Sequence, residues 1–225
     1  MMMQDLHLHT DFSDGKNTIE EMAEAAVSCG LREICFTDHV REGSDWWPDY
    51  FKTCRIAAKK YASVLQISCG VEAKVCDFHG TLDKPSNLDK RIFQVAALHR
   101  LPDGKGGFLR KDELLKYGQF AVDCWFSAMT GLRENLEISR IAHPFSLLPF
   151  MDISMDSEFW KRVMNIMDAG SYLIECNVKY DNSFVPQEFW MYFSERVVTG
   201  SDSHSVEDFR NIHHMNLKSA GNKND

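Results

Sequence analysis

The sequence lacks long apolar runs, paired cysteine motifs and an excess of basic residues. No segment of its 225 residues approaches the roughly 18 consecutive apolar residues of a membrane-spanning helix. Residues 1–10 contain neither the basic region nor the apolar core of a secretory signal, so we expect no signal and no membrane association. The 25 basic and 33 acidic residues give a formal net charge of −8, which disfavours binding to long nucleic acids.

The seven cysteines follow no metal-binding or redox spacing. Their number is odd and no C-x-x-C pair occurs, which excludes a zinc knuckle and favours free thiols in the reducing cytoplasm. The sequence also has no G-x-S-x-G, H-E-x-x-H or G-x-x-x-x-G-K-[ST] motif. A serine-hydrolase elbow, a zincin helix and a nucleotide-binding P-loop are therefore excluded.

Short apolar runs alternate with amphipathic stretches along most of the chain. Strands are predicted within 4–9, 33–37, 64–75, 92–98, 138–142, 172–178 and 196–199. Helices are predicted at 19–29, 50–62, 112–136, 159–167 and 186–195, the third of them long or broken. This alternation predicts an α/β fold with a parallel sheet, and the length favours a closed or nearly closed barrel in a single domain, 1–218, followed by a polar tail, 219–225.

Potential metal-binding side chains gather at the predicted carboxyl ends of the strands. In parallel α/β folds, active sites form at this edge. Taken singly, each residue has a simpler explanation, such as a histidine bonded to a backbone carbonyl or an aspartate in a turn. The set consists of His7, His9, Asp14, His39, Glu72, His99, His143, Asp202 and His204.

Two i, i+2 pairs make the case for a metal site. His7 and His9 lie two residues apart on a strand, so their rings project to the same face. Asp202 and His204 have the same spacing at the end of the last strand. The first and last strands of a barrel are neighbours, so the two pairs can converge on one centre. Such mixed nitrogen and oxygen ligands suit zinc, manganese or iron better than calcium or magnesium.

These motifs resemble those of the PHP family, named for polymerase and histidinol phosphatase, over nearly the whole chain. The resemblance implies a distorted (β/α)7 barrel with two or three divalent metal ions at its carboxyl edge, and phosphoester hydrolysis. The matching segments are Asp5-Leu6-His7-Leu8-His9-Thr10, Ser13-Asp14-Gly15, Thr37-Asp38-His39, Gly70-Val71-Glu72-Ala73-Lys74, Leu98-His99, Ala142-His143-Pro144 and Gly200-Ser201-Asp202-Ser203-His204.

The resemblance also implies how the ligands are shared. One metal is held by His7, His9, Glu72 and Asp202. Glu72 bridges to a second, held with His99 and His143, and a third is held by Asp14, His39 and His204. Some relatives have histidine in place of Asp14, which changes the chemistry of the third site.

The function expected from this pattern is hydrolysis of a small phosphomonoester by a metal-activated water, as in a histidinol phosphatase. His204 is the candidate proton donor to the leaving group. Lys74 and Arg100 follow the predicted ligands and are expected to contact phosphate, or else to form ion pairs at the edge. Glu175 and Asn177 are candidates to orient the ligands.

Two other functions fit the same residues. The metals could cleave phosphodiesters, which gives a nuclease or nucleotide-processing enzyme, although the acidic charge disfavours long nucleic acid. A non-catalytic metal-binding regulatory module is the second alternative, but such a module is expected to have lost ligands, and all nine positions here retain them. The oligomeric state is left open by the sequence.

Overall fold

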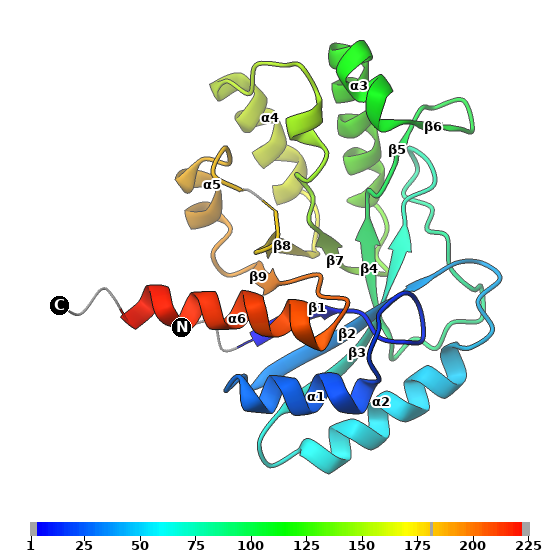
Figure 1. The fold of residues 1–225 in the computed structure, drawn as a ribbon. Helices are drawn as coiled ribbons and strands as arrows, with labels where there is room; N and C mark the ends of the chain where they lie inside the picture. Colours follow the sequence, from blue (N-terminus) through cyan, green and yellow to red (C-terminus); the bar gives the residue numbers. More distant parts are fainter. Residues whose placement is uncertain (1–3, 181, 222–225) are drawn as a thin grey trace.

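The computed structural model describes residues 4–180 and 182–221, and in this part of the chain seven parallel strands form the main sheet. Their order across the sheet is the order of the chain (Figure 1). They are β1 (Gln4–Leu8), β2 (Glu33–Val40), β3 (Gln66–Lys74), β4 (Phe93–Ala97), β7 (Ile138–Ala142), β8 (Leu173–Asn177) and β9 (Val197–Gly200).

The first strand meets the chain that follows the last one, so the sheet closes into a nearly complete barrel. The Asp202 amide donates to the His7 carbonyl at 2.9 Å, and the His9 amide donates to the Ser203 carbonyl at 3.0 Å. The predicted α/β barrel is confirmed. Because the contacts that close the barrel involve the residues of both i, i+2 pairs, closure itself places these pairs next to each other.

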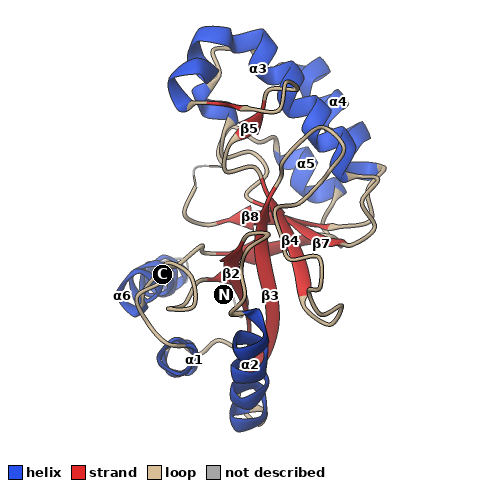
Figure 2. Ribbon diagram, turned by 90° about the vertical axis from the view of Figure 1, so that its right-hand side faces the viewer, coloured by secondary structure: helices blue, strands red, loops and turns tan. Residues whose placement is uncertain are grey.

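Helices cover the barrel on two sides (Figures 1 and 2). Both views place α1, α2 and α6 near β1–β3, and α3, α4 and α5 on the opposite side. They are α1 (Ile19–Ser28), α2 (Trp47–Tyr61), α3 (Lys111–Leu132), the short 3-10 helix η1 (Leu148–Phe150), α4 (Ser157–Asp168), α5 (Gln187–Tyr192) and α6 (Val206–Gly221). None of the helices in the described part of the chain has both the length and the apolar character needed to cross a membrane.

Local sequence signals explain several of these elements. Thr18 and Glu21 form the predicted capping box, with the Thr18 hydroxyl accepting from the Glu21 amide at 3.2 Å. The third helix, expected to be long or broken, is broken at Gly118, whose φ of 14° and ψ of −87° are not helical. α6 was not predicted, and neither was the small hairpin β5 (Leu101–Pro102) and β6 (Phe108–Leu109). α6 includes the first three residues of the predicted polar tail, and 222–225 lie outside the described residues.

The core consists of the apolar faces of the helices against the outside of the barrel. Trp125, Tyr50, Tyr172 and Phe145 are among its largest fully buried side chains. Beside their buried apolar residues, the strands also bury polar side chains, among them Gln94, Arg140 and Glu175. Burial of this kind makes the barrel a rigid support, so side chains at the strand ends have fixed positions.

Candidate metal centre

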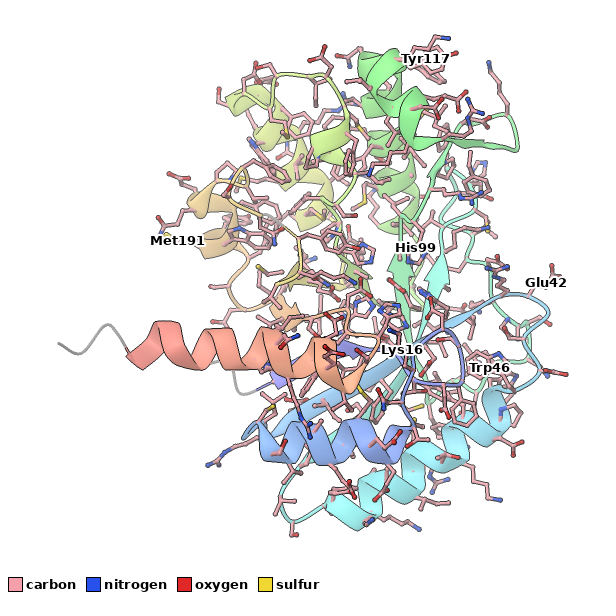
Figure 3. All side chains as sticks on the ribbon, viewed as in Figure 1. Lys16, Glu42, Trp46, His99, Tyr117 and Met191 are labelled. Carbon is pink, nitrogen blue, oxygen red and sulfur yellow. The ribbon has the colours of Figure 1, made fainter. Side chains whose placement is uncertain are left out.

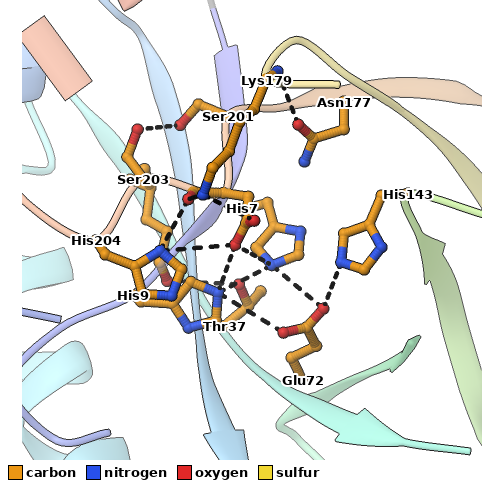
Figure 4. A network of polar contacts seen from close by, with 12 residues as sticks. His7, His9, Thr37, Glu72, His143, Asn177, Lys179, Ser201, Ser203 and His204 are labelled. Atoms are coloured by element: carbon orange, nitrogen blue, oxygen red, sulfur yellow. Dashed lines mark hydrogen bonds and ion pairs between the residues drawn. The ribbon is translucent and has the colours of Figure 1, made fainter. Parts of the chain in front are cut away.

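All nine residues singled out from the sequence lie at the carboxyl ends of the strands in one cluster. Figure 4 shows part of it, including His7, His9, Glu72, His143 and His204. Their side chains differ in exposure, and this divides the cluster in two. The outer group is partly exposed and consists of Asp14, His39, His99 and His204. The buried group consists of His7, His9, Glu72, His143 and Asp202.

The two i, i+2 pairs converge, although Asp202 and His204 lie beyond the end of β9, where Asp202 has a positive φ. His7 and His9 direct their Nε2 atoms toward each other, 3.0 Å apart. Oδ1 of Asp202 lies 3.1 Å from Nε2 of His9 and 3.6 Å from Nε2 of His7. The ring of His204 stacks on that of His9, with centroids 4.2 Å apart. Three nitrogen and oxygen atoms therefore face a common point between β1 and the segment after β9.

Glu72 lies at the centre of the cluster and contacts histidines on both sides. Its Oε1 is 3.0 Å from Nε2 of His143 and 3.5 Å from Nε2 of His7. Its Oε2 is 2.9 Å from Nδ1 of His39 and 3.2 Å from Nε2 of His99. This arrangement follows from the sheet, because His39 on β2 and Glu72 on β3 are direct partners in the register. A carboxylate placed in this way has the geometry of a bridging ligand.

Asp14 connects the outer group. Its Oδ1 is 3.4 Å from Nε2 of His204, and its Oδ2 is 3.5 Å from Nε2 of His39. His39 thus contacts Glu72 through one ring nitrogen and Asp14 through the other. His99 and His143, expected to share one metal, face different oxygens of Glu72.

The electrostatics of the buried group suit cation binding. Burial by itself would raise the pKa of Glu72, but nearby imidazoles, above all His7 and His99, hold it well below its usual range. Glu72 is therefore ionised at neutral pH. Burial lowers the pKa of His9 to about 4, so its ring is neutral and has a lone pair available. The ionised Glu72 and the neutral His9 are in the protonation states that metal ligands need. Burial alone would lower the pKa of His7, but the carboxylates of Glu175 and Glu72 raise it well above its usual value, so a metal has to displace a proton from that ring.

Unsatisfied polar atoms indicate that a positive group belongs in the cluster. Among the described residues, buried Nδ1 of His9 and Oε2 of Glu72 have no hydrogen-bond partner. His39 and His99 come within 3.2 Å of that oxygen, but without hydrogen-bond geometry. Unpaired buried polar atoms cost free energy, and a divalent cation would satisfy them. The residues present therefore fit a metal centre.

A further layer of polar side chains holds these residues in place. Nδ1 of His7 lies 2.8 Å from Oε2 of Glu175, so the ring can donate there and direct Nε2 into the cluster. Asn177 donates to the other oxygen of Glu175 at 2.7 Å. The i, i+2 spacing of Glu175 and Asn177 on β8 had indicated a supporting role.

Other supporting residues were not found from the sequence. Lys179 Nζ lies 3.2 Å from Oδ2 of Asp202, and the Tyr180 hydroxyl is 3.3 Å from the same oxygen. Asp38 accepts from the Thr10 amide at 2.8 Å and the Ser13 hydroxyl at 2.7 Å, which orders the loop that carries Asp14. In the sequence, the only sign of such a supporting role was the position of an ionisable residue next to the end of a strand.

Backbone strain coincides with the cluster. In residues 4–180 and 182–221, His143 and Asp202 are the two non-glycine residues with positive φ, at 30° and 53°. This region is unfavourable for residues with a side chain and persists where surrounding structure enforces it. Both belong to the buried group, so the fold maintains an unfavourable backbone in order to direct these two side chains inward.

The two predicted phosphate contacts line a cavity of about 640 Å³ that opens onto His39, Glu72 and His99. Lys74 Nζ is 3.4 Å from Oδ2 of Asp83, so its charge is partly compensated. Arg100 has no carboxylate within 4.0 Å among the described residues. Figure 3 shows His99 in the middle of the molecule, whereas Tyr117 and Met191 lie at its outer edge.

Comparison with known proteins identifies a family and relatives of this chain. The sequence pattern of the PHP domain family matches residues 5–179. A probable phosphatase from Caldicellulosiruptor saccharolyticus is 35% identical over 208 residues, 90% of this chain and 80% of that protein. A probable phosphatase from Aliivibrio fischeri is 34% identical over 219 residues, 92% of this chain and 80% of that protein.

Solved structures share the fold. A candidate histidinol phosphatase from Listeria monocytogenes superposes with a TM-score of 0.66 at 21% identity, covering 91% of this chain and 96% of its own. Histidinol phosphate phosphatase from Lactococcus lactis, solved with zinc, L-histidinol and phosphate, has a TM-score of 0.58 at 18% identity, with coverages of 94% and 92%.

The family match and the phosphatase relatives agree with the chemistry of the cluster. They confirm the prediction of a phosphoesterase and, in general terms, of a metal-dependent phosphatase. Over residues 5–179, which include the buried group except for Asp202, this chain belongs to the PHP domain family.

Proposed function

We propose that the protein hydrolyses small phosphomonoesters at a centre of two or three divalent metal ions, zinc, manganese or iron. The observation that carries this proposal is the position of Glu72, whose two carboxylate oxygens face histidines on opposite sides within 3.5 Å. The nine predicted ligands would hold the metals, with Glu72 as the bridge. The zinc and phosphate bound to the Lactococcus lactis protein support this assignment.

Divalent cations in the cluster would offset the charge of a phosphoryl group and lower the pKa of a water molecule that attacks phosphorus. The side chains of the protein have separate tasks. Glu175 fixes the tautomer of His7 by accepting from Nδ1. Arg100, and to a lesser degree Lys74, would contact phosphate oxygens from the adjacent cavity.

We assign protonation of the leaving oxygen to His204. Its Nδ1 lies 2.9 Å from the Asp202 carbonyl oxygen, so this nitrogen can donate and Nε2 is directed toward Asp14. The side chain is 28% exposed, which lets it reach both solvent and substrate. His204 can donate this proton only while its Nε2 is not bound to a metal. It therefore does not act as metal ligand and as proton donor at the same time.

The proposed substrate is small and phosphorylated, and the location is the cytoplasm. The net charge of −8 disfavours long nucleic acid, although single nucleotides would still fit the chemistry. All seven cysteines, each within the described residues, are free thiols, as expected in a reducing compartment.

The test is phosphate release by protein that has been stripped of metal and then reloaded. We expect the stripped protein to be inactive and zinc, manganese or iron to restore hydrolysis of phosphomonoesters. A phosphodiester such as bis(4-nitrophenyl) phosphate should react far more slowly. Equal turnover with and without metal would contradict the proposal, and a preference for the diester would favour the nuclease alternative.

A further inference from the structure

A second cavity, of about 580 Å³, lies beside the metal cluster and shares His99 and His143 with it. Its other walls come from the β5–β6 hairpin, the start of α3 and the segment that leads into η1. A phosphoester bound at the cluster has to place its organic part in an adjoining space. This cavity begins at two of the predicted ligands and is the natural place for the leaving group.

Most of the lining is apolar. Leu101, Leu109 and Leu114 line it and are buried in the fold. The partly exposed rings of Phe108 and Phe150 also contribute. Apolar walls of this kind favour a leaving group with a hydrocarbon or aromatic body, because burial of apolar surface drives its binding.

The charges in this cavity have one sign. Arg100, Arg110 and Lys111 line it, and none of the lining residues is an aspartate or glutamate. Arg110 is neutralised by Asp112, at 2.9 Å. Among the described residues, neither Arg100 nor Lys111 has a carboxylate partner within 4.0 Å.

Lys111 is held beside the cavity by an aromatic ring. Its Nζ lies 3.9 Å from the centroid of the Phe150 ring, which also lines the cavity. A cation–π contact of this kind orients an ammonium without cancelling its charge. The ammonium thus remains available to an anion in the cavity.

We propose, building on the proposed function, that the substrate is a phosphomonoester whose leaving group has an apolar body and a second anionic group. Lys111 determines this specificity by binding the second anion, a carboxylate or a phosphate, while Arg100, which lines both cavities, contacts the phosphoryl group. An amino alcohol such as L-histidinol would place an ammonium beside these cations with no acidic partner, which disfavours it. The same cavity therefore both attracts one class of substrate and rejects another.

The test uses benzyl phosphates that differ only at the para position. Metal-loaded protein is assayed for kcat/KM with 4-carboxybenzyl, 4-methylbenzyl and 4-(aminomethyl)benzyl phosphate. One charge-assisted contact predicts a preference of about tenfold or more for the carboxylate over the methyl ester, with the ammonium ester slowest. Adding 4-(phosphonomethyl)benzyl phosphate shows which of the two anions is preferred. Equal rates, or a preference for the ammonium ester, would overturn the proposal.

The responsible residue is tested through the ratio of the carboxylate to the methyl ester. Lys111→Met keeps most of the length of the side chain and removes its charge, and we expect the ratio to fall at least threefold toward unity. Lys116→Met is the matched control on the same helix, because Lys116 does not line the cavity. The control should keep the wild-type ratio, and an unchanged ratio in Lys111→Met would contradict the assignment.

Binding measurements test the specificity of the cavity independently of the proposed function. If no ester is hydrolysed under any metal condition, the proposed function fails, but calorimetry with 4-carboxybenzylphosphonate and 4-methylbenzylphosphonate still tests the cavity. We expect the carboxylate to bind about tenfold more tightly, with the difference reduced in Lys111→Met. Equal affinities would overturn the inference whether or not the protein is active.

Discussion

His7 on β1 directs Nδ1 at the carboxylate of Glu175 on β8, whose oxygens lie at 3.0 and 2.8 Å. Both side chains are fully buried. The contact spans 168 residues of sequence and joins β1 to β8. It holds the ring in the orientation that turns Nε2 toward His9 and Glu72, so the geometry of the centre depends on a residue that we do not assign as a ligand.

Glu175→Gln should weaken metal binding without removing a ligand. The amide binds Nδ1 of His7 less strongly and can favour the wrong tautomer, so we expect metal affinity to fall by about 10- to 100-fold. Competition titration with a chromogenic zinc chelator measures this. Glu188→Gln on α5 is the control, because Glu188 lies away from the cluster. Wild-type affinity in Glu175→Gln would show that the contact is dispensable.

Gly200→Ala should displace His7. A Cβ at this position would lie 2.6 Å from Cβ of His7 and 2.9 Å from Cδ of Glu175, closer than packed carbons come. We expect phosphatase activity to fall by at least tenfold and metal affinity to drop with it, because misplacement of a ligand by an ångström is costly. Gly43→Ala is the matched control, since nothing lies within 4 Å of its added Cβ. Activity retained by Gly200→Ala would contradict the close packing.

Metal removal should lower stability as well as activity. The ionised Glu72 and the neutral His9 attract a cation in the folded state only, so binding stabilises that state by mass action. Free metal at a hundred times its Kd gives about 2.7 kcal/mol, which for a chain of this size corresponds to a rise in Tm of roughly 5–10 °C. Differential scanning fluorimetry with added zinc or manganese measures the shift. Glu72→Gln should abolish most of this rise in Tm. A full rise in Tm in that variant would show that Glu72 does not bind the metal.

His213 on α6 forms a buried pair with Asp5 on β1, with Nε2 and Oδ2 2.9 Å apart. The other oxygen of Asp5 accepts from the Ser201 amide at 2.9 Å, next to the barrel closure. His213→Ala leaves a buried carboxylate oxygen unpaired, so the free energy of unfolding should fall by about 1–3 kcal/mol. Urea unfolding measures this, with His79→Ala at an exposed position as the control. An equal loss of unfolding free energy in both variants would show that the contact between His213 and Asp5 does not stabilise the fold.

Cys35 should resist alkylation in the folded protein. Burial raises the pKa of its thiol to about 11. Because the thiolate is the reactive form, only roughly one thousandth of this group is ionised at pH 8, and the rate should rise tenfold per pH unit while the fold persists. Iodoacetamide labelling followed by peptide mass spectrometry measures the rate, and unfolded protein in urea supplies the comparison. A rate for folded protein equal to that in urea would show the thiol to be accessible.

The composition of the candidate ligand set could be read from the sequence, because short-range rules determine it. Strand periodicity places His7 and His9 on one face, and the alternation of apolar runs with amphipathic stretches predicts a parallel barrel. At the carboxyl edge of such a barrel, residues far apart in sequence come together, as His39 and Glu72 do across β2 and β3. This much depends on backbone geometry, which the order of residue types already encodes.

The tertiary structure alone decided which atoms face one another. Packing between remote segments places a different pair of histidines at each oxygen of Glu72. It also holds His143 and Asp202 at positive φ, and it brings Lys179 and Tyr180 to the carboxylate of Asp202. The same holds for the charge of the adjoining cavity, because Arg110 is neutralised by Asp112 whereas Lys111 is not. Pairing of charges is set by distances of a few ångströms, and a sequence does not state distances.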